Sequence, residues 1–447
     1  MPSPSSEVPA LDVDVVIIGA GIQGLWLLAD LIENGYRAIL LERMRPGFGQ
    51  TGHSHVFLHE GHMFASMVRA PQQDILTRIE SVRQANQLWK TALDTGRLRH
   101  MAQLRNGFYV GWADENSALL FEGICKLAHL PYKTVHSPPG FGSLGEIRRF
   151  YETESISLES KALLEHLLDY RNLRNHVGYC KDVSVTAPTS DRFHLTAKCD
   201  SEKPVRSHGP DESLQIRAGA LVLSAGAGNE RLVNRLLAEA KIPMDPVATR
   251  QQTIKTFMLV VRHPKESLPP VSGMFHEFDS VFMVSRQDED GRTVWLIGNG
   301  RRELVQCAGE MTALDAATWF QGLESKLNQL FPQIIKNAND YEWGVYEATK
   351  AEPWTAKPLG EGGKFPSSYH VHRHPTIPIW LTWPTLLTFA PKVASEIVGE
   401  LKTTVRHASL STDWSVWNNF RKVLQPSECR WKTTPLLSWK DFTRCFT

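Results

Sequence analysis

Three glycines near the N-terminus have the spacing of a phosphate-binding turn. Residues 19–24 have the sequence GAGIQG, which places Gly19, Gly21 and Gly24 in the pattern GxGxxG. In such a turn the first glycine permits a tight bend, the second lets the backbone approach a pyrophosphate, and the third lets a helix pack closely on a strand. Glu42 lies where an acidic side chain accepts hydrogen bonds from the adenosine ribose and would repel a 2′-phosphate. The pattern predicts a dinucleotide other than NADP.

Four histidines and a glutamate form a second group that is capable of chemistry. They are His53, His55, His59, His62 and Glu60, and they follow residues 50–52 directly. A neutral imidazole can take up a proton near neutral pH, and histidine and glutamate are also metal ligands. Ordinary hydrogen bonding within a loop is the third interpretation. The residues alone leave these alternatives open.

The elements around the glycines are those that a dinucleotide site requires. Residues 13–18 are rich in Val and Ile, as in a strand buried on both faces of a parallel sheet. Residues 25–32 form an apolar helix that Asn34 and Gly35 end, and residues 38–41 form the second strand. Together they predict a βαβ unit that begins at residue 13, after a disordered lead-in over residues 1–12.

Composition limits the class of protein. The chain has 447 residues, 42% of them hydrophobic, which is enough for two connected domains. Its 49 basic and 48 acidic residues balance, so a small-molecule substrate is expected and a nucleic-acid partner is not. The six cysteines are scattered without metal-ligand spacing, and we predict no metal site. No stretch predicts a signal peptide or a membrane span, so we expect a soluble, cytoplasmic protein.

Four segments resemble the D-amino-acid oxidase superfamily of FAD-dependent oxidoreductases, which includes glycine oxidase, sarcosine oxidase and L-2-hydroxyglutarate dehydrogenase. They are residues 14–43, residues 46–55, residues 220–228, and residues 383–391 with the helix that follows over 393–401. In this superfamily the second segment passes over the flavin. Pro391 fits the first turn of the last helix, whose positive end in such proteins faces the flavin. The resemblance identifies the cofactor as FAD.

The resemblance also implies which residues contact FAD. They are Gly19, Gly21, Ile22, Gln23, Gly24, Glu42, Arg43, Gln50, Thr51, Gly52, His53, Ser54, Val183, Ala225, Gly226, Leu386, Leu387, Thr388 and Pro391. Relatives such as dimethylglycine dehydrogenase attach the flavin covalently through a histidine near this loop. His53 and His55 are therefore candidates for a covalent link or for a general base near flavin N5.

A second catalytic stretch is expected over residues 343–353, which resemble a strand that faces the flavin. Relatives that oxidise amino acids often have Arg-Pro here to hold the substrate carboxylate, whereas this chain has Tyr346 and Glu347. Glu347 is a candidate partner for a substrate amine, Tyr346 a hydrogen-bond donor, and Lys350 a residue near the flavin. A partly solvated strand end is the alternative interpretation. The missing arginine argues against a free amino acid or hydroxy acid as substrate.

The expected fold is α/β, with a Rossmann-type FAD-binding domain interleaved with an α+β substrate domain on a mixed antiparallel sheet. We assign residues 13–70, 155–235 and 355–405 to the FAD-binding domain, 71–154 and 236–354 to the substrate domain, and 406–447 to a C-terminal extension. Helices are expected over 75–95 and 158–173, and strands over 107–112, 183–185, 193–198, 255–261, 281–284 and 294–298. Residues 203–213 are polar and predict a hairpin loop.

The predicted function is transfer of a hydride from a C–N bond of an amine or amino-acid derivative to flavin N5. Oxygen or another acceptor then reoxidises the flavin. One alternative is a dehydrogenase of 2-hydroxy acids, favoured by the likeness of residues 50–53 to L-2-hydroxyglutarate dehydrogenases. Further alternatives are a flavin-binding protein without turnover and a strictly NAD-dependent dehydrogenase.

Overall fold

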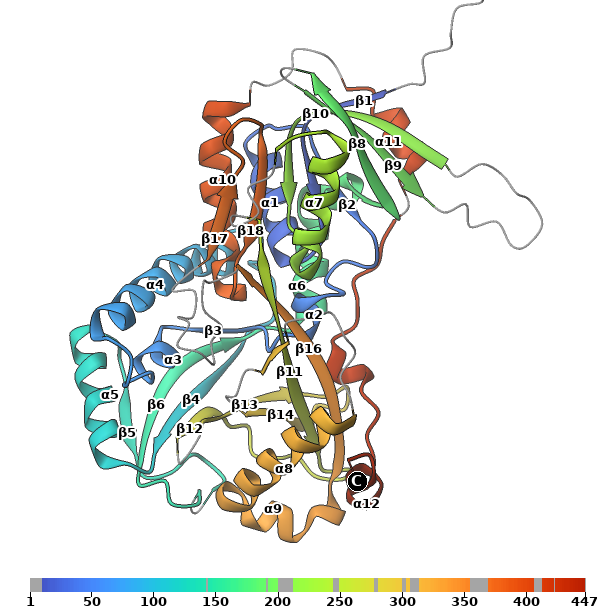
Figure 1. Ribbon diagram of the computed structural model, residues 1–447. Coiled ribbons are helices and arrows are strands. Elements are labelled where there is room, and N and C mark those ends of the chain that lie inside the picture. The colour runs from blue at the N-terminus through green and yellow to red at the C-terminus, as the bar shows by residue number, and fades with distance from the viewer. Residues whose placement is uncertain are drawn as a thin grey trace, which may run out of the picture.

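The computed structural model contains two units, each built on one mixed β-sheet (Figure 1). The structure describes residues 10–141, 144–189, 192–199, 212–243, 249–276, 280–299, 303–305, 313–353, 369–405, 412–421 and 423–446. Within these residues the first sheet has eight strands and the second has ten. The predicted α/β class, a Rossmann-type unit interleaved with an α+β unit, is confirmed.

The first sheet contains the glycine turn. Its strand order is β17 (His370–Arg373), β18 (Ile379–Trp383), β10 (Glu212–Leu223), β1 (Ala10–Ile18), β2 (Ala38–Glu42) and β7 (Val177–Tyr179). The strands from β18 to β7 run parallel, whereas β17 is antiparallel to β18. β8 (Asp182–Thr189) and β9 (Arg192–Cys199) extend the sheet as an antiparallel pair bonded to β10.

Helices cover both faces of this sheet, which is why its central strands are apolar on both sides. α1 (Ile22–Glu33), α6 (Ser160–Asp169) and α10 (Ala390–Thr404) pack on one face with Val15 and Ile17. α7 (Asn229–Glu239) and α11 (Trp414–Phe420) pack on the other face with Val16. Figure 1 shows α1 and α10 on one side of the strands and α7 on the other.

The first strand begins earlier than predicted. β1 starts at Ala10, so the expected disordered lead-in over residues 1–12 is wrong for residues 10–12. Leu11 is fully buried, and Asp12 forms ion pairs with Arg192 and Arg217. No local pattern marks Asp12 as part of a strand, because its two cationic partners lie on strands far along the chain.

The second sheet forms the lower unit of Figure 1. Its order is β15 (Glu303–Val305), β11 (Gln251–Arg262), β14 (Thr293–Asn299), β13 (Ser280–Gln287), β12 (Ser272–His276), β4 (Leu104–Trp112), β6 (Arg149–Ser157) and β3 (Phe57–His59). β16 (Glu342–Pro353) pairs with β11 along its whole length, and β5 (Lys133–Val135) pairs with β6. All these pairs are antiparallel except β12 with β4.

The helices of the lower unit pack on different parts of this sheet. α8 (Ala313–Leu330) and α9 (Pro332–Lys336) cover one face through a cluster that includes Trp295, Trp319 and Phe331. α3 (His62–Ala65), α4 (Gln72–Asp94) and α5 (Glu115–Leu127) pack near β4 and β6, where Phe108 and Phe121 are fully buried. None of the helices within the described residues is long and apolar enough to cross a membrane.

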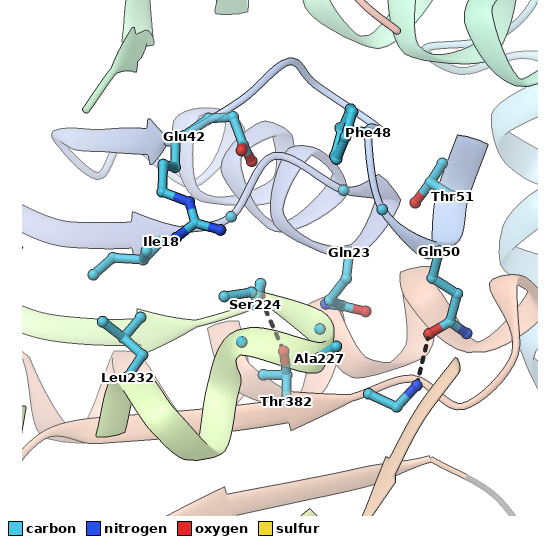
Figure 2. Close-up of a pocket in the computed structure, with 18 of the residues that line it drawn as sticks. Ile18, Gln23, Glu42, Phe48, Gln50, Thr51, Ser224, Ala227, Leu232 and Thr382 are labelled. Carbon is cyan, nitrogen blue, oxygen red and sulfur yellow. Dashed lines mark hydrogen bonds between the residues drawn. The ribbon is translucent and has the colours of Figure 1, made fainter. Parts of the chain in front are cut away.

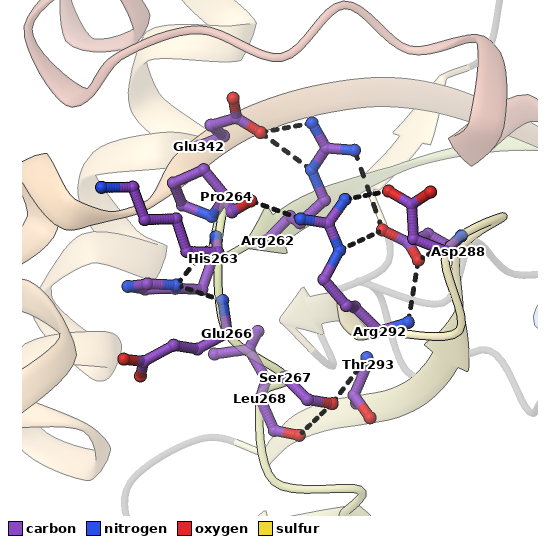
Figure 3. A network of polar contacts seen from close by, with 12 residues as sticks. Arg262, His263, Pro264, Glu266, Ser267, Leu268, Asp288, Arg292, Thr293 and Glu342 are labelled. Atoms are coloured by element: carbon purple, nitrogen blue, oxygen red, sulfur yellow. Dashed lines mark hydrogen bonds and ion pairs between the residues drawn. The ribbon is translucent and has the colours of Figure 1, made fainter.

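A polar network closes the outer end of the second sheet (Figure 3). Arg262 of β11 bonds Glu342 of β16 at 2.8 Å and lies 3.8 Å from Asp288. Asp288 also accepts hydrogen bonds from the backbone N–H groups of Asp290 and Arg292, at 3.0 and 2.8 Å. The network therefore fixes the turn between β13 and β14.

The chain crosses between the units several times. β3 lies within residues 13–70, which we assigned to the first unit, yet it pairs with β6 of the second sheet. The domain limits given above stay a prediction.

The predicted helix 158–173 ends at Asp169, and a 3-10 segment, η1 (Tyr170–His176), follows with Arg171 and Asn172 in left-handed conformations.

Most predicted elements occur where the patterns placed them. α4 covers the predicted helix 75–95 to within one residue at its C-terminal end, and the six predicted strands fall inside β4, β8, β9, β11, β13 and β14. Most of the predicted hairpin loop 203–213 lies outside the described residues. The strands on either side of it, β9 and β10, do pair antiparallel.

The C-terminal segment joins the two units. Trp417 is fully buried against the first sheet and donates a hydrogen bond to Asn175 O at 2.6 Å. Farther along, Leu437 and Trp343 of β16 exchange two backbone hydrogen bonds, at 2.8 and 2.9 Å. The chain then ends beyond α12 (Trp439–Arg444) at the lower end of the molecule (Figure 1).

Candidate functional site

A cavity of about 1250 Å³ lies between the glycine turn, α2 (Gln50–His53) and the ends of β16 and β18. Figure 2 shows Gln23, Glu42, Thr51 and Ser224 around this space. Most of the residues predicted to contact FAD line this cavity. They are Gly19, Gly21, Ile22, Gln23, Glu42, Arg43, Gln50, Thr51, His53, Ser54, Val183, Ala225, Gly226, Leu386 and Leu387. The cavity thus brings together segments that are far apart in the sequence.

The glycine turn has the steric form that its sequence predicts. Gly19 has a φ of 109°, and a Cβ on it would lie 2.5 Å from Ser224 O. A Cβ on Gly24 would lie 1.9 Å from Gly19 O, so the helix could not keep its distance from the strand. Only glycine fits these two positions.

Glu42 stands at one end of the cavity and holds the turn. Its carboxylate accepts hydrogen bonds from the backbone N–H groups of Ala20 and Met44, both at 2.7 Å. Burial raises the pKa of Glu42, and these hydrogen bonds act in the opposite direction. Each carboxylate oxygen has a second lone pair, so the group can still accept from ribose hydroxyls.

The buried side chain of Gln23 indicates that the cavity binds a polar ligand. It is buried and lines the cavity, and neither its Nε2 nor its Oε1 has a partner among the described residues. An orphaned buried amide is costly unless a ligand or water bonds it. A bound dinucleotide fits this requirement.

α2 lies within the predicted flavin loop and forms hydrogen bonds to both sides of the cavity. Thr51 Oγ1 accepts a hydrogen bond from Ile22 N at 3.0 Å, and Gln50 Oε1 accepts one from Ala351 N at 3.3 Å (Figure 2). Two non-glycine residues flank the same region with positive φ values, Val56 at 41° and Thr385 at 55°. Such strain persists where the surroundings enforce it, often at functional sites.

Four of the predicted cofactor residues do not line the cavity, and three of them support its walls. Gly24 packs α1 on β1, and a Cβ on Gly52 would lie 2.5 Å from Gly47 O. Thr388 O accepts a hydrogen bond from Trp89 Nε1 at 2.9 Å. The fourth, Pro391, lies in the first turn of α10, as its sequence position predicts.

The structure separates His53 from His55. His53 lines the cavity, and burial together with the nearby Arg430 lowers its pKa. His55 does not line the cavity; its ring lies 4.8 Å from that of Phe282, and burial lowers its pKa to about 3. Both imidazoles are therefore neutral at pH 7. A covalent flavin link stays a prediction, and of the two histidines only His53 faces the cavity.

The other members of the histidine cluster have partners elsewhere. His59 Nδ1 accepts from Gly61 N at 3.1 Å, His62 Nε2 bonds Pro131 O at 2.9 Å, and Glu60 pairs with Lys90 at 2.9 Å. Among the described residues, no three His, Cys, Asp or Glu side chains come together as metal ligands. His59 and His62 hold the loop in place.

The second predicted catalytic stretch, residues 343–353, forms part of the cavity wall, but not through the residues that were predicted to be catalytic. Thr349 and Ala351 line it, whereas Tyr346, Glu347 and Lys350 do not. Lys350 forms an ion pair with the buried Glu352, and Tyr346 is buried on the second sheet. The catalytic roles of these three residues stay predictions.

Sequence reasoning missed several basic residues. Arg231, Arg235 and Arg250 line the cavity, where positive charge suits a diphosphate. Arg231 and Arg235 are four residues apart in the helix that follows Gly226 and Gly228, and this spacing, which places them on one helix face, was the signal for them. Arg286 of β13 is buried near His55 and Tyr346, and no pattern marked it.

Comparisons with known proteins agree with this geometry. The model of the FAD dependent oxidoreductase family, DAO, matches residues 14–376. A probable FAD-dependent oxidoreductase of Pseudomonas aeruginosa is 23% identical over 404 residues, which cover 88% of this chain and 92% of the relative. Its crystal structure has a TM-score of 0.63 at 20% identity, over 95% of this chain and 99% of that one.

Two further solved structures share the fold. L-α-glycerophosphate oxidase from Mycoplasma pneumoniae with FAD bound has a TM-score of 0.59 at 14% identity, covering 89% of this chain and 97% of that one. Glycine oxidase from Geobacillus kaustophilus has a TM-score of 0.56 at 14% identity, covering 90% and 97%. The family match extends over most of the chain, and the cavity has the glycine turn, the acidic residue and the loop that FAD requires. The chain belongs to the DAO family of FAD-dependent oxidoreductases.

Proposed function

We propose that this chain oxidises a small amine or amino-acid derivative at its C–N bond. The observation that supports this proposal is that one cavity extends from the glycine turn to His53 and to the end of β16. The first end suits the diphosphate of FAD, and the second suits the isoalloxazine ring. A substrate bound beside His53 and β16 would then lie against the flavin.

When bound in the cavity lined by Gln23, Glu42 and Thr51, FAD would supply flavin N5 as the acceptor of the substrate hydride, and oxygen or another acceptor would reoxidise it. The protein's task is to position the substrate and to manage its protons. An amine that binds as an ammonium ion must lose a proton first, because the nitrogen lone pair forms the C=N bond as the hydride leaves the neighbouring carbon. His53 is the residue of the cavity wall best suited to accept that proton, since burial keeps its imidazole neutral.

The preference for a C–N bond has support from one fold relative, which is named glycine oxidase. A hydroxy compound is the second candidate. It is favoured by the resemblance of residues 50–53 to L-2-hydroxyglutarate dehydrogenases and by the relative named L-α-glycerophosphate oxidase. The same neutral imidazole would take the proton of a hydroxyl group.

Anaerobic reduction of the purified holoprotein separates these candidates. Glycine, sarcosine, L-proline and dimethylglycine are mixed with the protein alongside L-2-hydroxyglutarate and glycerol 3-phosphate, and loss of the flavin band is recorded. Bleaching by an amine but by neither hydroxy compound supports the proposal. Bleaching by a hydroxy compound alone overturns it, and bleaching by none of them favours a protein without turnover on these substrates.

A further inference from the structure

Gln252 is a second buried amide in the cavity wall that lacks a hydrogen-bond partner. It lies near the start of β11, and 5% of the residue is exposed. Neither its Nε2 nor its Oε1 is bonded within the part of the chain that the structure describes. A buried amide in this condition is unfavourable unless a ligand or water bonds it. Because an amide has N–H donors and a carbonyl acceptor, the partner that satisfies it offers both an acceptor and a donor.

The neighbours of Gln252 place it at the end of the cavity that suits the isoalloxazine ring. Gln252 is opposite Glu352 in the pairing of β11 with β16, and the residue next to Glu352, Ala351, lines the cavity. Ala351 N donates a hydrogen bond to Gln50 Oε1 at 3.3 Å (Figure 2). Gln252 is thus one strand away from the loop of His53, whose buried Nδ1 also has no partner among the described residues.

The preceding residue, Gln251, connects the same strand to the C-terminal flavin segment. Its Nε2 donates a hydrogen bond to Ala227 O at 2.6 Å, and its Oε1 accepts one from Trp383 Nε1 at 3.1 Å. Trp383 ends β18, and residues 386–387 line the cavity between β18 and α10. The amide of Gln251 is therefore bonded within the protein on both its nitrogen and its oxygen, whereas that of Gln252 is left for a ligand.

The pyrimidine ring of a flavin has the pattern that this amide requires. Its N3–H group is a donor, and the C4=O group beside it is an acceptor. An amide that accepts from N3–H and donates to C4=O forms two parallel hydrogen bonds, as glutamine does with the edge of an adenine base. The diphosphate of FAD offers acceptors alone, so it would leave Gln252 Oε1 unpaired.

We propose that Gln252 binds the isoalloxazine ring of FAD through the N3–H and C4=O groups. Residues of the flavin loop and of the segment before α10 then border the same ring. A hydrogen bond donated to C4=O also stabilises the negative charge that the ring gains on reduction, so it raises the reduction potential. The inference concerns the cofactor, and it does not depend on which substrate the protein oxidises.

The test compares the binding of FAD with that of 3-methyl-FAD, in which a methyl group replaces the N3 proton. Each compound is titrated into the apoprotein, and binding is measured from the quenching of flavin fluorescence. The wild type should bind 3-methyl-FAD about 10- to 100-fold more weakly than FAD, because the methyl group removes the donor and leaves Gln252 Oε1 unpaired. In Gln252→Ala the affinity for FAD should fall about 10-fold, and the two compounds should bind about equally.

Gln23→Ala is the matched control, because it makes the same change at the other unpartnered amide of the cavity. It should weaken the binding of both compounds by the same factor and so keep the preference for FAD. Gln252→Leu retains the bulk of the side chain without its polar atoms. In both variants of Gln252 the reduction potential of the bound flavin should lie below that of the wild type.

Equal binding of the two compounds by the wild type would overturn the inference, because N3–H would then have no partner in the protein. Retention of the wild-type preference in Gln252→Ala would also overturn it, since the amide would then bind the ribityl chain or another part of the cofactor. An unchanged reduction potential in Gln252→Leu would exclude the bond to C4=O. An apoprotein that binds neither compound would overturn the inference together with the assignment of FAD.

Discussion

The backbone N–H of Ile22 donates a hydrogen bond to Thr51 Oγ1 at 3.0 Å, across 29 residues of sequence. Ile22 is the first residue of α1, and Gly21 before it has no side chain to cap the helix. Thr51 supplies that cap from α2. The contact therefore couples the phosphate-binding turn to the loop that carries His53.

Thr51→Val should weaken FAD binding. The substitution retains the shape of the side chain but removes the acceptor, which leaves a helix N–H unpaired and costs about 0.5–2 kcal/mol. We expect a lower affinity of the apoprotein for FAD, measured by fluorescence quenching on titration. Thr51→Ser restores the oxygen and should restore most of the affinity. Equal FAD affinity in Thr51→Val and wild type would show that the cap does not position the loop.

Gly24→Ala should damage the turn itself. The added Cβ would lie 1.9 Å from Gly19 O, so α1 must move away from β1. We expect a loss of unfolding free energy of about 1–3 kcal/mol and a reduced flavin content. Gly399→Ala in α10 is the control, because no atom lies within 4 Å of its added Cβ. It should stabilise the protein by about 0.5–1 kcal/mol and leave flavin content unchanged, and similar behaviour of the two variants would contradict the packing argument.

Stability should fall on acidification, partly because of His62. Burial lowers its pKa from 6.5 to about 4, against the opposing effects of Pro131 O and Glu60, and His59 lies close to it. Between pH 6.5 and about pH 4, His62 binds more protons in the unfolded chain than in the folded one. The histidine's contribution is therefore complete above pH 6.5 and is lost as the pH falls toward 4, at up to about 1.4 kcal/mol per pH unit.

His62→Gln isolates this contribution, since the amide can still donate to Pro131 O. Urea unfolding at pH 7, 6 and 5 should show a shallower dependence of unfolding free energy on pH than in the wild type. Parallel pH profiles for the two proteins would mean that His62 is not the residue responsible.

The network of Figure 3 should stabilise the protein without affecting the cofactor. Asp288→Ala removes the acceptor of two backbone N–H groups and a charge facing Arg262 and Arg292. We expect a loss of about 1–3 kcal/mol of unfolding free energy in thermal or chemical denaturation, with unchanged flavin content. Asp290→Ala, at an exposed side chain, should cost less than about 1 kcal/mol. A loss of flavin in Asp288→Ala would contradict the separation of this network from the cavity.

Much of the first unit was predictable because its signals are local. A β-branched run, three glycines and an apolar helix stand next to one another in the sequence, and Gly19 and Gly24 fulfil the steric roles that their spacing predicts. The histidine cluster was harder to interpret. Its members alternate along a short loop, and only the packing decides that His53 faces the cavity while His62 turns toward Pro131.

The surroundings of Arg286 could not be predicted, because they depend on contacts between distant segments. Arg286 looks like an ordinary strand residue, and its lack of an acidic partner becomes apparent only when β13, β16 and residues 54–56 are placed together. Cys429 and Trp431 likewise border this region from a tail that no local pattern assigned to a site.

The most direct test of the central claim is titration of the apoprotein with FAD, in which binding is measured from the flavin absorbance band at about 450 nm. We predict saturation at one FAD per chain and loss of tight binding in Gly24→Ala. An apoprotein that binds NAD but not FAD, or that binds FAD equally well when Gly24 is alanine, would contradict the assignment of the cavity.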